Sequence, residues 1–134
     1  PVGMAAYGMD SHNVRRYVND LGFVENEGNV EAYVEKPFPI SYRSIIPNKK
    51  ESENLVVPVC LSASHIAFGS IRMEPVFMVL GQSSAIIASL AIQNNMRVQD
   101  LNYNKLKSVL IDRGQILEWK IWRYPVYIYR KCNF

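Results

Sequence analysis

The feature that most constrains this chain is the apolar run from Pro75 to Gln93, which is too long for a strand and contains few polar residues. Its longest polar side chains, Gln82 and Gln93, share one narrow stripe at helical spacing, and small residues form a second stripe: Gly81, Ser84, Ala88 and Ala91. The pattern predicts a helix buried on most sides, inside a larger protein or a membrane. The polar residues in its middle and the absence of a basic flank argue against a membrane span.

The start of this helix is where chemistry is expected. Pro75 suits the first helical position, and Glu74 complements the positive end of the helix dipole. Upstream, residues 69–72 could form a loop whose backbone N–H groups and Arg72 face an anionic or electron-rich ligand atom. On spacing alone, the preferred interpretation is an ordinary capped helix with a solvated Arg72. Before that loop, residues 54–60 are expected to form a short apolar strand with Cys60 buried, giving a strand, loop and helix.

Further elements are expected on both sides of this unit. The spacing of apolar residues predicts a short helix over Ser11–Leu21, a strand over Val30–Val34 and a second amphipathic helix over Tyr103–Asp112. The fold class is therefore α/β, or α+β for the chain as an isolated piece. Asp10 and His12 provide too few ligands to define a metal site.

Residues 40–46 combine polar and apolar side chains in extended sequence. Tyr42 and Arg43 stand among apolar residues, so at least one of them is expected to face a pocket or a partner. The alternative is a half-buried strand with an arginine whose stem lies along the apolar surface.

Charge and cysteine content exclude little but favour some classes. Four basic residues and one acidic residue in 118–134 account for the whole net charge of +3, so residues 1–117 are neutral and nucleic-acid binding is not expected. The aromatic, basic tail could be a contact surface, but an edge strand blunted by Pro125 is the preferred interpretation. The two cysteines define no disulfide framework and leave the compartment open. No signal peptide is expected.

Several cofactor and catalytic motifs are absent from the 134 residues. There is no GxGxxG, GxxxxGK[ST], GxSxG or HExxH. If the chain belongs to an enzyme, its defining cofactor motif lies elsewhere.

Five segments carry a resemblance to a known family: ISYRSIIP at 40–47, NLVVPVC at 54–60, SASH at 62–65, GSIR at 69–72 and MVLGQ at 78–82. Together they resemble the C-terminal part of the FAD-dependent oxidoreductase family, which shares its two-dinucleotide-domain plan with succinate dehydrogenase-like flavoproteins. Some members carry a xanthan lyase label. The resemblance covers about residues 7–118 and is most specific over 39–91.

This resemblance implies a division of the chain and a set of site residues. Residues 1–53 would end a substrate or cap region, 54–117 would form the C-terminal strand, loop and helix of a Rossmann-like FAD domain, and 118–134 a basic aromatic tail. The helix starting near Pro75 would point its N-terminus at the flavin. His65 and Arg43 would bind substrate or transfer protons, and the cofactor contacts would be Ser64, Gly69, Ser70, Ile71, Arg72 and Pro75.

The chain departs from the family because it lacks the N-terminal βαβ unit with its glycine-rich pyrophosphate loop. FAD is therefore expected in the full-length protein, while the isolated chain should bind it weakly or not at all and be inactive. An exposed edge on strand 54–60 would favour homo-oligomers. Two other functions stay open: a polysaccharide lyase using Tyr42 as base, Arg43 as carboxylate neutraliser and His65 as acid, and a non-catalytic binding or assembly module. The substrate would be a small molecule or a carbohydrate.

Overall fold

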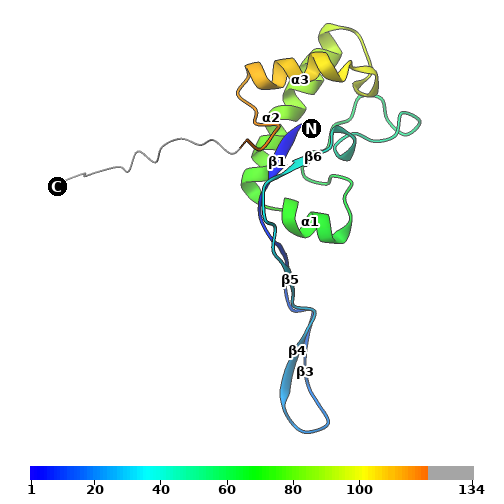
Figure 1. The fold of residues 1–134 in the computed structure, drawn as a ribbon. Helices are drawn as coiled ribbons and strands as arrows, with labels where there is room; N and C mark the ends of the chain where they lie inside the picture. Colours follow the sequence, from blue (N-terminus) through cyan, green and yellow to red (C-terminus); the bar gives the residue numbers. More distant parts are fainter. Residues whose placement is uncertain (121–134) are drawn as a thin grey trace, which may run out of the picture.

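A central helix organises the structure, a computed structural model that describes residues 1–120. Helix α2 (Glu74–Gln93) packs against strand β1 (Gly3–Ala5), which pairs with β6 (Phe38–Ile40), and against helix α3 (Tyr103–Asp112) (Figure 1). One stripe of α2 is buried: Val76, Leu80, Ser83, Ile87 and Ala91. With buried residues of β1, β6 and α3, it forms a single hydrophobic core. The mixed α/β class expected from the sequence is confirmed.

Local signals place both long helices correctly. The Asn94 N–H caps the end of α2 on the carbonyl oxygen of Leu90, and Asn95 follows with a φ of 49°. At the start of α3, the Asn102 side chain accepts hydrogen bonds from two backbone N–H groups. Gly114 follows α3 with a φ of 84°, a conformation that favours glycine. The predicted boundaries of these helices are confirmed.

Helix α2 is less enclosed than its sequence suggests. It is long and apolar enough to cross a membrane by length and composition, yet only 22% of its most apolar 18-residue window is buried by the described residues. Met78 and Ile92 are 76% and 80% exposed. Residues 1–120 bury one stripe of α2, so burial on most sides, inside a larger protein or a membrane, stays a prediction.

The predicted helix over Ser11–Leu21 is wrong, because this region is half of a long β-hairpin. Strand β2 (Met9–Ser11) pairs with β5 (Val30–Ala32), and β3 (Arg15–Val18) with β4 (Val24–Glu27), all antiparallel. The two pairs continue the β1–β6 ladder into an arm that projects from the body (Figure 1). The strand expected over Val30–Val34 is thereby confirmed in its first three residues.

The turn at the tip explains why the helical spacing misleads. The Asn19 side-chain oxygen accepts hydrogen bonds from the N–H groups of Leu21 and Phe23, both at 3.0 Å. Gly22, at a φ of 84°, reverses the chain. This turn aligns Tyr17 with Glu25 on the opposite strand, and the Tyr17 hydroxyl donates to its carboxylate. These side chains therefore contact partners on the opposite strand and do not share one face of a helix.

The expected strand at residues 54–60 does not form. One backbone bond, from the Val57 N–H to the Ile45 carbonyl, ties this segment to the residues after β6, and Cys60 is exposed rather than buried. Pro58 lacks the N–H that a ladder needs. The exposed strand edge, from which self-association was inferred, is therefore absent.

Short helices replace two other expected elements. The loop expected before α2 is helix α1 (His65–Ile71), and residues 40–46 contain the 3-10 helix η1 (Tyr42–Ser44) instead of a strand. A second 3-10 helix, η2 (Val98–Asp100), connects α2 to α3. The expected edge strand in the tail falls from residue 121 onward outside the described residues.

Candidate functional site

The N-terminus of α2 is an open helix end beside an apolar groove. Its N-cap residue, Met73, forms no side-chain hydrogen bond to the first turn, in which Glu74 and Pro75 are exposed. In this turn the Val76 N–H donates to the Met73 carbonyl oxygen at 2.9 Å, and Pro75 has no N–H. The Glu74 N–H is therefore the donor left for a ligand. The helix end carries a partial positive charge. The end is neither capped by its own side chain nor buried, so it can receive an electron-rich atom.

The adjoining groove, here called the Pro75 groove, has a volume of about 440 Å³. This volume falls within the range of roughly 300–1,000 Å³ that is usual for small-molecule sites. It runs beside the first two turns of α2. Four segments of the chain form its three walls: Met4–Ala6 with Pro37, then Pro75, Val76, Val79 and Gln82 of α2, and finally Gly114–Ile116 with Trp119. Most of these side chains are apolar, so the groove suits a flat hydrophobic ring next to the helix end.

The six residues expected to contact a cofactor are divided by the structure. Pro75 lines the groove, whereas Gly69, Ser70 and Ile71 are buried in the last turns of α1. Their backbone N–H groups lie within a helix, so the expected ligand-facing loop is wrong, while their contact with a cofactor stays a prediction. Ser64 caps α1, its hydroxyl oxygen accepting from the Ala67 N–H at 3.2 Å.

Arg72 and its neighbours hold the base of the arm. The guanidinium of Arg72 donates to the Asp10 carbonyl oxygen at 3.2 Å and lies 3.4 Å from the Asp10 carboxylate. The Ser70 hydroxyl donates to the Tyr7 carbonyl oxygen. A Cβ on Gly69 would lie 3.2 Å from the Met9 side chain, so β2 packs closely on α1 at this point. These contacts fix the segment that leads into α2, which is a positioning role.

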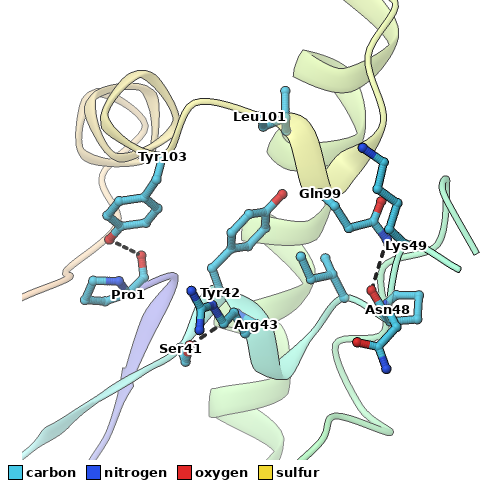
Figure 2. Close-up of a pocket in the computed structure, with 11 residues that line it drawn as sticks. Pro1, Ser41, Tyr42, Arg43, Asn48, Lys49, Gln99, Leu101 and Tyr103 are labelled. Atoms are coloured by element: carbon cyan, nitrogen blue, oxygen red, sulfur yellow. Dashed lines mark hydrogen bonds between the residues drawn. The ribbon is translucent and has the colours of Figure 1, made fainter.

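A second hollow, the Tyr42 cavity, has a volume of about 580 Å³ and lies between η1, η2 and the start of α3 (Figure 2). Tyr42 and Arg43 both line it, which confirms that this pair faces a pocket. The Tyr42 hydroxyl donates to the Val98 carbonyl oxygen, and burial raises the pKa of Tyr42 to about 12. The Tyr103 hydroxyl donates to the Pro1 carbonyl oxygen at 2.9 Å, and burial likewise raises the pKa of Tyr103.

The remaining polar groups of the Tyr42 cavity are mostly engaged within the protein. The Gln99 amide donates to two backbone carbonyl oxygens, at 2.7 and 3.0 Å, and Lys49 forms an ion pair with Asp100 at 2.7 Å. Arg43 is exposed at the edge of the cavity. Most polar groups of the cavity therefore hold segments of the protein together, and the Arg43 guanidinium is open to solvent.

The two candidate catalytic residues are not brought together in one site. Arg43 lines the Tyr42 cavity, next to the η2 segment that follows the C-terminal end of α2. His65 is the exposed first residue of α1 and does not line that cavity. The described residues also contain no group of three or more His, Cys, Asp or Glu side chains that could hold a metal ion.

Comparison with known proteins identifies the family. The sequence model described as FAD dependent oxidoreductase matches residues 1–110, which is most of the chain. The chain therefore belongs to the FAD-dependent oxidoreductase family. No curated protein and no solved structure matches it.

Sequence reasoning missed the third wall of the Pro75 groove. Ile116 and Trp119 follow the end of α3, beyond the part of the chain that the family model matches. Their i, i+3 spacing gives no signal of this wall, because the segment after Gly114 is not a helix.

Proposed function

We propose that this chain is a part of an FAD-dependent oxidoreductase that supplies the helix end facing the flavin ring. The observation that carries the proposal is the uncapped N-terminus of α2 beside the Pro75 groove. A reduced flavin carries negative charge near N1 and O2, which the positive end of a helix stabilises. Membership of the family supports FAD as the ligand.

The residues present fit one part of the cofactor only. The first turn of α2 would hold the pyrimidine side of the ring through the Glu74 N–H and the partial positive charge of the helix end, and the apolar groove would exclude water. Hydride or electron transfer is the chemistry that the flavin supplies when bound. The 134 residues contain no GxGxxG, so the pyrophosphate and adenine would be held by other polypeptide.

His65 and Arg43 differ in how well they suit this site. His65, the exposed first residue of α1, lines neither the Pro75 groove nor the Tyr42 cavity, and the family resemblance alone retains it as the candidate for proton transfer or substrate binding. Arg43 lines the Tyr42 cavity instead and suits a separate contact with an anionic substrate group.

The lyase alternative is less favoured by the geometry. Its base, Tyr42, donates its hydroxyl hydrogen to a backbone carbonyl, and its pKa of about 12 keeps the phenol neutral near pH 7. A non-catalytic binding or assembly module is the conclusion if neither flavin nor an acidic sugar binds.

Flavin content tests the proposal. The longest natural polypeptide that contains these residues should purify with one FAD per chain, visible as yellow absorbance. The 134-residue chain alone should bind added FAD at least about a hundredfold more weakly, because it lacks the pyrophosphate loop. Stoichiometric flavin on the short chain, or a long polypeptide that binds no flavin, would overturn the proposal.

A further inference from the structure

The segment after α3 is held firmly although its largest side chain is exposed. Leu117 is 3% exposed, the Gln115 amide donates to the Val79 carbonyl oxygen at 3.0 Å, and Glu118 forms an ion pair with Lys107 at 2.7 Å. These contacts fix the backbone on both sides of Ile116 and just before Trp119. Trp119 is nevertheless 54% exposed, and Ile116 is 68% exposed.

These exposed side chains face a defined space. Both line the Pro75 groove opposite the first turns of α2, and Pro37 lines it as well. An indole held at the edge of an apolar groove offers a flat face to a second ring, and offset or edge contacts between aromatic rings add stability beyond the area that they bury. The positive end of α2 beside the groove favours a ring that is electron-rich.

We propose that Trp119 packs against the isoalloxazine ring of the flavin. It would form one wall of the flavin site. This inference rests on the proposed function. Trp119 would limit solvent access to the ring and hold it against α2, which is a binding and positioning role. The residues that the family model matches end at 110, so Trp119 lies outside them.

The test uses the longest natural polypeptide that contains these residues, purified with its flavin. An indole in contact with a flavin quenches the fluorescence of that flavin. Trp119→Leu removes the indole. Tyr33→Leu is the matched control, because Tyr33 is an aromatic side chain, 87% exposed, outside the groove. Thermal unfolding of both variants checks that each is folded.

The expected result is a several-fold increase in the fluorescence yield of bound flavin and a several-fold weaker FAD affinity in Trp119→Leu, with neither change in Tyr33→Leu. If flavin is bound but both properties of Trp119→Leu match the parent, the role of Trp119 is overturned while the proposed function stands. If the parent polypeptide binds no flavin, both are overturned.

Discussion

Tyr42 shows how a residue that looks catalytic in the sequence can be structural. Its ring lies between the start of α3 and η2 (Figure 2), and its hydroxyl joins η1 to the Val98 carbonyl, 56 residues along the chain. Burial disfavours the charged phenolate, which raises the pKa from 10 to about 12. The residue therefore connects two segments and is unsuited to accept a proton.

Replacing Tyr42 with Phe tests this structural role. The change leaves the Val98 carbonyl without its partner and should lower the free energy of unfolding by about 1 kcal/mol at pH 7. Because the folded pKa is higher than the unfolded one, the contribution of Tyr42 is complete below pH 10 and is lost as the pH rises from 10 to about 12. Urea unfolding should therefore show the parent losing more stability than Tyr42→Phe in this interval.

Tyr33→Phe serves as the control, because the Tyr33 side chain is 87% exposed. The stability of this variant should equal that of the parent at pH 10 and at pH 12. Equal stability losses of the parent and Tyr42→Phe between pH 10 and 12 would contradict the assignment.

At the scale of elements, the contact between β1 and α2 depends on the absence of a side chain at Gly3. A Cβ at this position would lie 2.7 Å from a methyl carbon of Val79, so either the Val79 side chain would have to shift or the strand and the helix would have to separate. Gly81, two residues after Val79 on the same helix, has open space where a Cβ would be placed. The two glycines therefore offer a matched pair of substitutions.

Gly3→Ala should lower the free energy of unfolding by about 1–3 kcal/mol through overpacking. Gly81→Ala should raise it by about 0.5–1 kcal/mol, because alanine favours the helix. Chemical denaturation of the 134-residue chain measures both. The packing of β1 on α2 would be wrong if Gly3→Ala were as stable as the parent.

Elements with local start and stop signals could be predicted, and elements made by distant contacts could not. Pro75, Asn102 and Gly114 mark helix ends through their own conformations and hydrogen bonds, so α2 and α3 follow from the sequence. The arm depends on pairing between residues up to 23 positions apart, as in Met9 with Ala32. The spacing of apolar residues in the arm is compatible with a helix, and the turn formed by Asn19 is the local feature that indicates a hairpin instead.

The candidate site was predictable to the same degree. The helix end at Pro75 was found because its signals are local, whereas Arg72 was assigned to a ligand although it binds Asp10, which lies 62 residues earlier. The groove itself is formed by four separate segments that only the fold brings together. No spacing rule in the sequence connects Ala5, Pro37 and Trp119.

At the scale of the whole molecule, α2 separates two kinds of surface. The Pro75 groove lies beside its N-terminal turns, and the Tyr42 cavity lies near the segment that follows its C-terminus. Along its length, Met78 and Ile92 leave apolar surface uncovered by residues 1–120. This arrangement suits a helix with one face in the core described here and with other polypeptide of an oxidoreductase on the opposite face.

The most direct test of the central claim is the reduction potential of flavin bound to the longest natural polypeptide, compared between Met73→Asp and Met73→Asn. Both side chains can accept a hydrogen bond from the first turn of α2, and they differ by one negative charge. If this turn faces the ring, the aspartate should lower the potential on the order of 30 mV relative to the asparagine, a tenfold change for a two-electron couple. Equal potentials in the two variants would contradict the claim that the N-terminus of α2 faces the flavin.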